Sequence, residues 1–425
     1  MVNARHFSEL PPLSLYVHLP WCVKKCPYCD FNSHEAKGDL PEAQYIDALL
    51  DDLATEMPSV WGRTFTSVFI GGGTPSLFSA DAMHNLLSGI RALTGLTPNA
   101  EVTMEANPGA IEAARFDEFR HAGVNRLSIG VQSFNDVQLK HLGRVHDANE
   151  AHKAIEVARR AGFDNLNVDL MFGLPEQSEA DALTDLQTAL AHSPEHLSYY
   201  ELTIEPNTLF ARFPPKVPED DKRWDMQQAA NEALVDAGFK RYEVSAWSQA
   251  NRQSQHNLNY WLFGDYVGIG AGAHGKISFA DSNQILRRWK HKHPNTWMAA
   301  GPNHKSDNQA AARLGTDMST KLGGEQIIAV EDTGLEFMMN ALRLSDGFPL
   351  SLFTTHTGVS IQPWLGAIQT GIDQGLLSRD NGHLRATERG FELLNDVLAL
   401  FMPTDGSGEE TGSTASQFTI PIKPA

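Results

Sequence analysis

The chain has 425 residues, so a length of roughly 150 residues per domain predicts two or three domains, one of them large. Hydrophobic residues make up 41% and charged residues 20%, which is typical of a globular protein and excludes a wholly disordered chain. The formal net charge of -18 opposes nonspecific binding to phosphate backbones, so we expect no nucleic-acid partner.

The sequence also carries information on location. Residues 1–12 lack the apolar core of a secretion signal, and no segment reaches about 18 consecutive apolar residues. We therefore expect a cytoplasmic protein that is not an integral membrane protein. All three cysteines fall within eight residues, which indicates a metal or cluster site in a reducing compartment rather than a disulfide framework.

Short apolar runs alternate with amphipathic stretches in the first half of the chain. The runs predict strands at residues 13–19, 65–70, 101–106, 126–131, 165–172 and 196–202. The stretches between them predict helices at 42–55, 80–93, 111–122, 148–161 and 179–191. Six such units favour a parallel sheet in an incomplete (β/α)6 barrel related to the TIM barrel, with the active site at the C-terminal ends of the strands.

The pattern changes after a proline-rich crossing at residues 213–218, where we expect the barrel to end. Two further strands are predicted at 242–247 and 267–269. From residue 334 the pattern is helical, with a hairpin at 375–387 and a helix from Glu388, which resembles a winged helix. Winged helices often bind DNA, but the acidic composition favours a structural or interaction role.

These patterns predict an α/β fold in which the incomplete barrel is followed by a mostly helical, winged-helix-like C-terminal domain. The predicted parts are an N-terminal lead at 1–12, the barrel at 13–235, a connecting region at 236–333, the C-terminal domain at 334–402 and a disordered tail at 403–425.

Cys22, Cys26 and Cys29 have the spacing C-x3-C-x2-C, which lets one loop hold three corners of a [4Fe-4S] cluster. The chain has no fourth cysteine, so the remaining iron would keep an open position for a substrate. The alternative is a zinc site that adds His18 or His34 to the three cysteines, within a zinc-stabilised interaction module.

The run from Tyr16 to Phe31, YVHLPWCVKKCPYCDF, resembles the cluster loop of radical-SAM proteins, in which an aromatic residue such as Tyr28 precedes the third cysteine. Within that superfamily the chain is similar, over nearly its whole length, to the oxygen-independent coproporphyrinogen III oxidase-like family, which includes the haem chaperones of the HemW type. The resemblance implies S-adenosylmethionine (SAM) at the open iron and an electron donor of the flavodoxin or ferredoxin type.

The resemblance also assigns residues to SAM binding. These are Tyr16, Tyr28, the turn Gly72-Gly73-Thr74, and the polar residues Glu105, Gln132, Arg144 and Asp169. Of these four polar residues, all but Arg144 are expected at or just beyond strand ends. Alternatively, the glycines form only a tight turn, and the polar residues cap helices or close salt bridges.

Two departures separate this sequence from the oxidase pattern. Phe31 stands where the oxidase has another cysteine. Residues 1–12 alone precede the first predicted strand, so we expect no counterpart of the longer N-terminal extension of the oxidase. The sequence HNLNYW, from His256 to Trp261, resembles the HNxxYW motif associated with haem binding in the chaperones. The resemblance implies an axial His256 ligand with Tyr260 and Trp261 against the porphyrin, although an unliganded loop histidine is the alternative.

The first hypothesis is therefore a haem chaperone that binds haem and transfers it to an unidentified acceptor protein. It would carry a [4Fe-4S] cluster and SAM, and we expect it to lack coproporphyrinogen III dehydrogenase activity. The competing hypothesis is the oxidase itself, in which a deoxyadenosyl radical removes a propionate hydrogen. The sequence assigns no catalytic residue with certainty.

Overall fold

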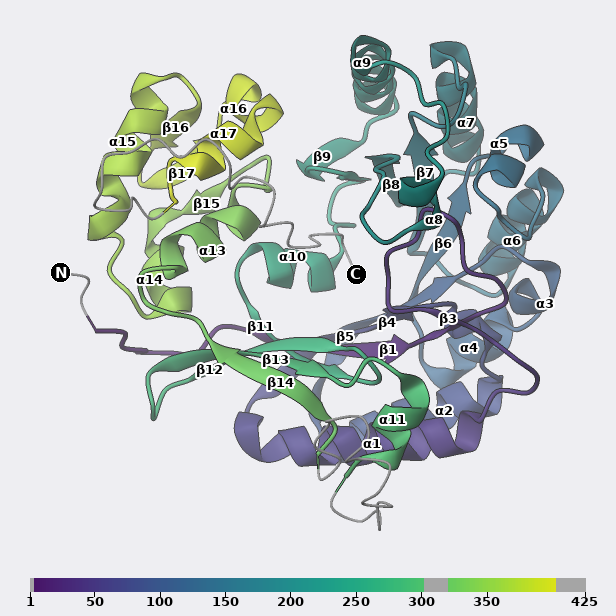
Figure 1. The fold of residues 1–425 in the computed structure, drawn as a ribbon, viewed down its shortest axis with the longest axis horizontal. Coiled ribbons are helices and arrows are strands. Elements are labelled where there is room, and N and C mark those ends of the chain that lie inside the picture. Colours follow the sequence, from purple (N-terminus) through teal and green to yellow (C-terminus); the bar gives the residue numbers. More distant parts are fainter. Residues whose placement is uncertain (1–3, 302–319, 403–425) are drawn as a thin grey trace.

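The computed structural model describes residues 4–301 and 320–402. Within them lies a twelve-stranded sheet of order β14-β13-β12-β11-β1-β4-β5-β6-β7-β8-β10-β9. Its parallel strands are β11 (Asp265–Ile269), β1 (Leu13–Leu19), β4 (Thr64–Gly72), β5 (Gly95–Ala106), β6 (Arg126–Gln132), β7 (Leu166–Phe172) and β8 (His196–Glu201). The sheet curves without closing (Figure 1), so the predicted incomplete barrel is confirmed.

Helical elements follow strands β1 and β4 to β8, and the longer ones pack on the outer face of the sheet. They include α1 (Glu42–Glu56), η1 (Met57–Val60), η2 (Pro75–Leu77), α2 (Ala80–Leu93), α3 (Ala110–Ala113), α4 (Phe116–Ala122), α5 (Asp136–His141), α6 (Ala148–Arg160), α7 (Glu179–Ala191), α8 (Leu209–Arg212) and α9 (Asp220–Asp236). Phe65, Val68 and Ile70 of β4 share one buried core with Leu49 of α1 and Leu86 of α2. The side chains on the opposite face of the sheet point into the interior of the barrel.

The predicted helix at 111–122 is interrupted in the structure. It is divided into α3 and α4 because the chain turns at Arg115, whose guanidinium Nη1 donates to the carbonyls of Leu77 (3.0 Å) and Phe78 (3.2 Å). The helical periodicity continues across this turn, so the sequence pattern does not show the interruption.

The sheet extends beyond the six predicted units. Strand β11 pairs in parallel with β1, and the antiparallel strands β12 (His274–Phe279), β13 (Gln284–Lys290) and β14 (Leu322–Ile327) continue that edge, with α11 (Pro294–Ala299) between the last two. The single strand predicted at 242–247 is wrong. It is a hairpin of β9 (Lys240–Glu243) and β10 (Ala246–Ser248), and the Glu243 carboxylate accepts from the Ser245 amide at 3.1 Å inside the turn.

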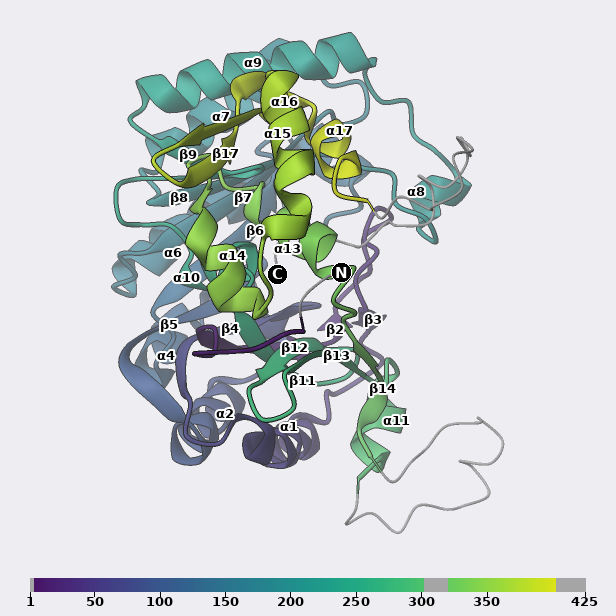
Figure 2. The same cartoon turned by 90° about the vertical axis from the view of Figure 1, so that its left-hand side faces the viewer.

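The C-terminal domain has its own core, which includes Phe337, Phe348, Phe353 and Trp364. Its elements are α13 (Thr333–Ala341), β15 (Phe348–Pro349), α14 (Leu350–Thr357), η3 (Gln362–Trp364), α15 (Leu365–Asp373), β16 (Leu377–Asp380), β17 (His383–Ala386), α16 (Glu388–Glu392) and α17 (Leu394–Ala399). Helices around a small sheet confirm the winged-helix-like class (Figure 2). The domain boundaries stay predictions, and the tail at 403–425 lies outside the described residues.

A short helix, α10 (Gln255–Trp261), lies between the barrel and the C-terminal domain (Figure 1). The Arg343 guanidinium lies 4.4 Å from the centre of the Trp261 ring and also donates to Glu243 at 3.1 Å. The rings of Phe263 and Phe337 meet at a centroid distance of 5.6 Å. Helix α10 is thus in contact with both parts of the molecule.

Asp265, at the start of β11, is a buried ionic centre. Its carboxylate accepts from Arg63 at 2.8 Å, Lys276 at 2.9 Å and the Ser278 amide at 2.9 Å. Burial alone would raise the pKa of Asp265, but the two cations outweigh it and hold the pKa below its ordinary value. The carboxylate therefore stabilises the added strands β11 and β12.

We expect Asp265→Asn to lower the free energy of unfolding by about 3 kcal/mol, because the change leaves buried Lys276 without its counter-charge. The control Asp346→Asn, in an exposed pair with Lys240, should change it by less than about 1 kcal/mol. Urea unfolding measures both. Because the folded-state pKa of Asp265 is depressed, the difference should be complete above its ordinary value and shrink as the pH falls through the folded-state value. Equal losses in the two variants would contradict this role.

Candidate cluster and cofactor site

The cysteine loop is fixed to the glycine turn by backbone hydrogen bonds. Strand β1 leads into β2 (Trp21–Cys22), which pairs with β3 (His34–Glu35). The amide of Gly73 donates to the Leu19 carbonyl at 2.8 Å, and the amide of Thr74 donates to the Trp21 carbonyl at 2.7 Å. The C-terminal ends of β1 and β4 therefore hold the first cysteine in place.

Close packing explains the glycines of this turn. A Cβ atom on Gly72, whose φ is +117°, would lie 2.6 Å from His18 Cε1, and one on Gly73 would lie 2.5 Å from the Trp21 carbonyl oxygen. The missing side chains therefore make room for the β1 segment rather than for an open cradle. This observation supports the alternative that glycines are needed here for a tight turn. The role of Gly72, Gly73 and Thr74 in binding SAM stays a prediction.

The three thiols are partly exposed and lie near one another. Burial raises the pKa of the Cys22 thiol to about 11; Thr74 opposes the rise through a hydrogen bond, and Cys29 and Cys26 add to it. Burial also raises the pKa of Cys29. Iron would have to displace these protons, as it does when thiolates become ligands. Three soft sulfur donors on one loop are a chemical fit for three irons of a [4Fe-4S] cluster.

The two histidines of the zinc alternative differ in how free their ring nitrogens are. Both ring nitrogens of His18 are engaged, with the Tyr16 hydroxyl at 2.9 Å and the Asn32 carbonyl at 2.9 Å. His34 Nε2 has no hydrogen-bond partner among the described residues. In residues 4–301 and 320–402, no three His, Cys, Asp or Glu side chains, the three cysteines included, are arranged around a single metal ion, so this geometry does not separate zinc from a cluster.

Arg144 links the cysteine loop to the barrel. Its Nη1 lies 3.6 Å from the Cys26 sulfur, and its Nη2 donates to Asn107 Oδ1 at 2.6 Å and to the Gly130 carbonyl at 2.7 Å. Asn107 in turn donates to Thr74 Oγ1 at 3.1 Å. The structure thus brings Arg144, Thr74 and Cys26 together through Asn107, a residue the sequence analysis missed although it lies in the same MEANP stretch as Glu105.

The other polar candidates line the inside of the barrel. Glu105, near the end of β5, accepts from the Gly72 amide at 2.9 Å, and burial together with Asp169 raises its pKa to about 7. Gln132 ends β6 with a φ of +70° and accepts from the Tyr200 hydroxyl at 2.7 Å. The sequence analysis also missed Tyr200. Tyr199 and Tyr200 are adjacent on β8, so they face opposite sides of the sheet, and their residue type alone does not show which of them points inward.

Asp169 corrects one expectation. It lies in the middle of β7 and not at a strand end, because the strand turns alternate residues inward along its whole length. Its carboxylate accepts from Asn167 at 2.7 Å and from Ser128 at 3.2 Å. Burial raises the pKa of Asp169 despite these bonds.

The two tyrosines flank this interior at different points. Tyr16, on β1, stacks with Phe69 at a centroid distance of 6.3 Å, and burial and Glu105 raise its pKa. Tyr28, inside the cysteine loop, lies beside Phe210 of α8 at 6.3 Å. The predicted SAM candidates thus extend from mid-strand positions at Tyr16 and Asp169 to the cluster loop, while their contacts with SAM stay predictions.

The HNLNYW segment forms helix α10 rather than a loop. His256 has no exposed surface; its Nδ1 lies 3.1 Å from Ser67 Oγ, and its ring lies 5.1 Å from that of Phe69 on β4. Burial lowers the pKa of His256 to about 3, so the imidazole is neutral. Nε2 has no partner among the described residues, which fits a ligand atom, although no porphyrin reaches it while α10 stays in place.

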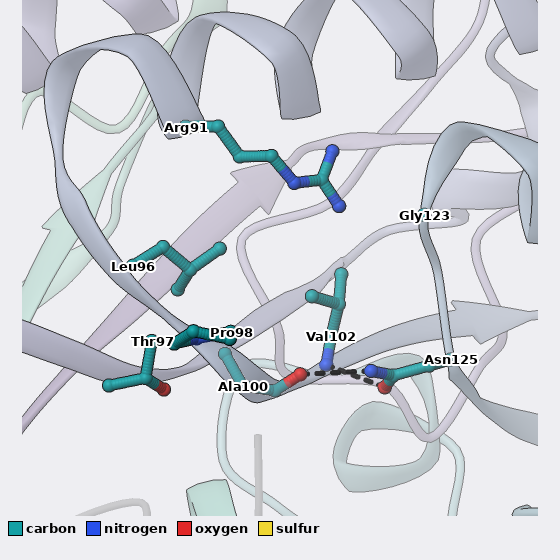
Figure 3. Close-up of a pocket in the computed structure, with 8 residues that line it drawn as sticks. All are labelled: Arg91, Leu96, Thr97, Pro98, Ala100, Val102, Gly123 and Asn125. Atoms are coloured by element: carbon teal, nitrogen blue, oxygen red, sulfur yellow. Dashed lines mark hydrogen bonds between the residues drawn. The ribbon is translucent and has the colours of Figure 1, made fainter.

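The partners of His256 in the motif differ in exposure. Tyr260 is half-buried against Tyr266, with ring centroids 4.2 Å apart, and Trp261 is buried beneath Arg343. A separate hollow lined by Arg91, Pro98 and Asn125 lies at the start of β5 (Figure 3). It is at the opposite end of the strand from Glu105, and none of the candidate residues lines it.

Comparison with known proteins agrees with this geometry. A profile of the Radical SAM superfamily matches residues 16–189, and one of the HemN C-terminal domain matches residues 328–393. The solved coproporphyrinogen III oxidase (HemN) of Escherichia coli has a similar fold, with a TM-score of 0.75 at 22% identity over 92% of this chain and 90% of that one. The chain is therefore a radical SAM superfamily protein with a HemN-type C-terminal domain.

Sequence relatives define the family more narrowly. The chain is 46% identical to the heme chaperone HemW of Escherichia coli K12, over 93% of this chain and 99% of the relative. It is 44% identical to the heme chaperone HemW of Haemophilus influenzae over 93% and 99%, respectively. A mouse protein, the mitochondrial radical S-adenosyl methionine domain-containing protein 1, is 34% identical over 92% and 87%. The chain belongs to the HemW family.

We expect Gly73→Ala to lower the free energy of unfolding by about 1–3 kcal/mol and to reduce the iron retained after anaerobic reconstitution. The added Cβ would meet backbone of Trp21 and push the turn away from Cys22. Gly366→Ala is the matched control, because a Cβ there has nothing within 4 Å and lies in helix α15. If Gly73→Ala matched this control in urea unfolding and iron content, the turn would not position the cluster loop.

Proposed function

We propose that the protein is a haem chaperone, which binds haem and transfers it to an acceptor protein while carrying a SAM-ligated [4Fe-4S] cluster. The observation that carries this proposal is the 46% identity to a heme chaperone HemW across 93% of the chain. The three thiols on one loop, with Arg144 beside the Cys26 sulfur, and the partnerless Nε2 of His256 support it from the structure.

In this proposal Cys22, Cys26 and Cys29 hold the cluster and Arg144 places a positive charge beside the Cys26 sulfur. When bound, the cluster and SAM supply one-electron chemistry at the SAM sulfonium. Glu105, Gln132 and Asp169 offer oxygen acceptors to the polar groups of SAM, and Asn107 keeps Arg144 aligned. An electron donor of the flavodoxin or ferredoxin type belongs to the same proposal.

Haem binding through His256 requires helix α10 to move away from β4, because the imidazole has no exposed surface. Tyr260 and Trp261 lie on the same helix and would move with it, so they can flank a bound porphyrin. The acceptor protein remains to be identified. None of the helices in the described residues is long and apolar enough to cross a membrane, and a cytoplasmic location stays a prediction.

Anaerobically reconstituted protein should be brown, bind about four irons per chain and lose them in the Cys26→Ala variant. With SAM, reductant and coproporphyrinogen III it should form no protoporphyrinogen, because the relatives of high identity are haem chaperones. Iron analysis and product chromatography measure the two outcomes. A protein that contained zinc and no iron would refute the cluster. Repeated turnover of coproporphyrinogen III would refute the chaperone hypothesis in favour of the oxidase.

Haem titration tests the ligand. We expect His256→Ala to weaken haem binding by about tenfold or more and to shift the Soret band, because the iron loses its axial nitrogen. His84→Ala, at an exposed position on α2, is the control and should bind haem as the wild type does. An unchanged Soret spectrum and affinity in His256→Ala would remove His256 as the ligand.

A further inference from the structure

Arg126 is a buried cation in the middle of the barrel. It is the first residue of β6, is only 2% exposed, and lies opposite Thr103 in the register of β5 and β6. Its charge opposes the rise that burial causes in the pKa of Asp169 of β7, and it adds to the lowering that burial causes in the pKa of His196 of β8 and His256 of α10. The guanidinium therefore lies on the inner side of the barrel, close enough to β7, β8 and α10 for its charge to act on them.

In the described part of the chain, the Arg126 guanidinium forms no side-chain hydrogen bond or ion pair, and its Nε is fully enclosed without a partner. The neighbouring carboxylates are committed elsewhere. Glu101 accepts from Ser254 Oγ at 3.3 Å and from the His256 amide at 3.2 Å, so it holds the N-terminus of α10. Asp169 is bound to Ser128 and Asn167.

A buried guanidinium without a direct ion pair is costly, because its desolvation is not offset by hydrogen bonds to a carboxylate. Arg presents a planar fork of donors that matches a carboxylate in a bidentate manner. A buried Arg of this kind is suited to bind an anionic group that a ligand supplies.

Two more polar atoms without partners lie on the same inner surface. Thr103 Oγ1 and His256 Nε2 are both fully enclosed, and neither has a hydrogen-bond partner among the described residues. Thr103 pairs with Phe69 on one side and Arg126 on the other, and the Phe69 ring lies 5.1 Å from His256. Polar atoms without partners thus recur along one strip from α10 to β6.

We propose that Arg126, with Thr103 as a second donor, is the receptor for a carboxylate group of the ligand that enters the barrel. This inference rests on the proposed function, because haem carries two propionate carboxylates. The same chemistry is offered by a small free carboxylate. His256 borders the receptor, so one ligand is held by its iron and by its acidic edge.

The test compares Arg126→Met with the surface control Arg160→Met, which makes the same change of charge and size at an exposed position on α6. Each protein is titrated with haem and with haem dimethyl ester, whose carboxylates are blocked. The ligand-free proteins are unfolded in urea. The melting temperature of each is also measured in sodium acetate and in sodium chloride of equal ionic strength.

We expect the wild type and Arg160→Met to bind haem at least about tenfold more tightly than the ester, and Arg126→Met to bind both with the weaker affinity. Ligand-free Arg126→Met should unfold at the same or a higher urea concentration, since an unpaired buried charge is removed. A variant that keeps the preference for haem, or that is destabilised without ligand, overturns the receptor and makes Arg126 a structural residue.

The acetate measurement separates this inference from the proposed function. If the wild type binds no haem, the haem proposal fails, and the receptor stands only if acetate raises the melting temperature of the wild type and not that of Arg126→Met. The same acetate response together with equal affinity for haem and its ester assigns the site to a small carboxylate. Without an acetate response and without a difference between haem and ester, the receptor is refuted.

Discussion

The register between β1 and β4 is the constraint on which the site depends. His18 pairs with Gly71 and Leu19 with Gly72, so the two strands end side by side and their following loops must share one narrow space. Only residues without side chains fit against His18 and Trp21 there. The position of Cys22, and through Asn107 that of Arg144, is therefore set by backbone geometry before any cofactor is considered.

Alternation along the parallel strands separates the stabilising face from the chemical one. Outward residues such as Val68 and Ile70 join a continuous apolar core with the helices. Inward residues are polar on strand after strand: Glu101 and Glu105 on β5, Arg126 on β6 and Asp169 on β7. Burying so many polar groups costs stability unless they have hydrogen-bond partners, and the three carboxylates have them. A buried polar side chain without a partner, such as Arg126, consequently indicates where a ligand could bind.

Local patterns were sufficient for the barrel and for placing the three cysteines on one loop. The six strands followed from short apolar runs, and the cysteine loop from spacing alone, because both are encoded by neighbours in sequence. The edge strands β12 to β14 could not be predicted in this way. Strand β13 carries Arg287, Arg288 and Lys290, and it is stable because Lys290 pairs with Asp52 at 2.7 Å on distant helix α1. Such pairings join residues more than two hundred positions apart, and no local signal reports them.

The same limit applied inside the site. Glu105 and Gln132 lay where the strand ends were expected, whereas Asp169 was placed at an end and lies mid-strand. The burial of His256 within a helix was also not visible, because HNLNYW has no strong periodicity. Its depth depends on β4 and on the C-terminal domain packing from opposite sides.

The contact of Arg343 with Trp261 has a thermodynamic consequence. Because α10 is held by the C-terminal domain as well as by the barrel, any ligand that displaces it must also break this contact, and its apparent affinity is reduced by that free energy. Linkage is reciprocal, so a protein that binds the C-terminal domain and releases Arg343 would raise the affinity of the barrel for that ligand by the same factor. Conversely, ligand entry would strengthen binding of that partner, which couples loading to delivery.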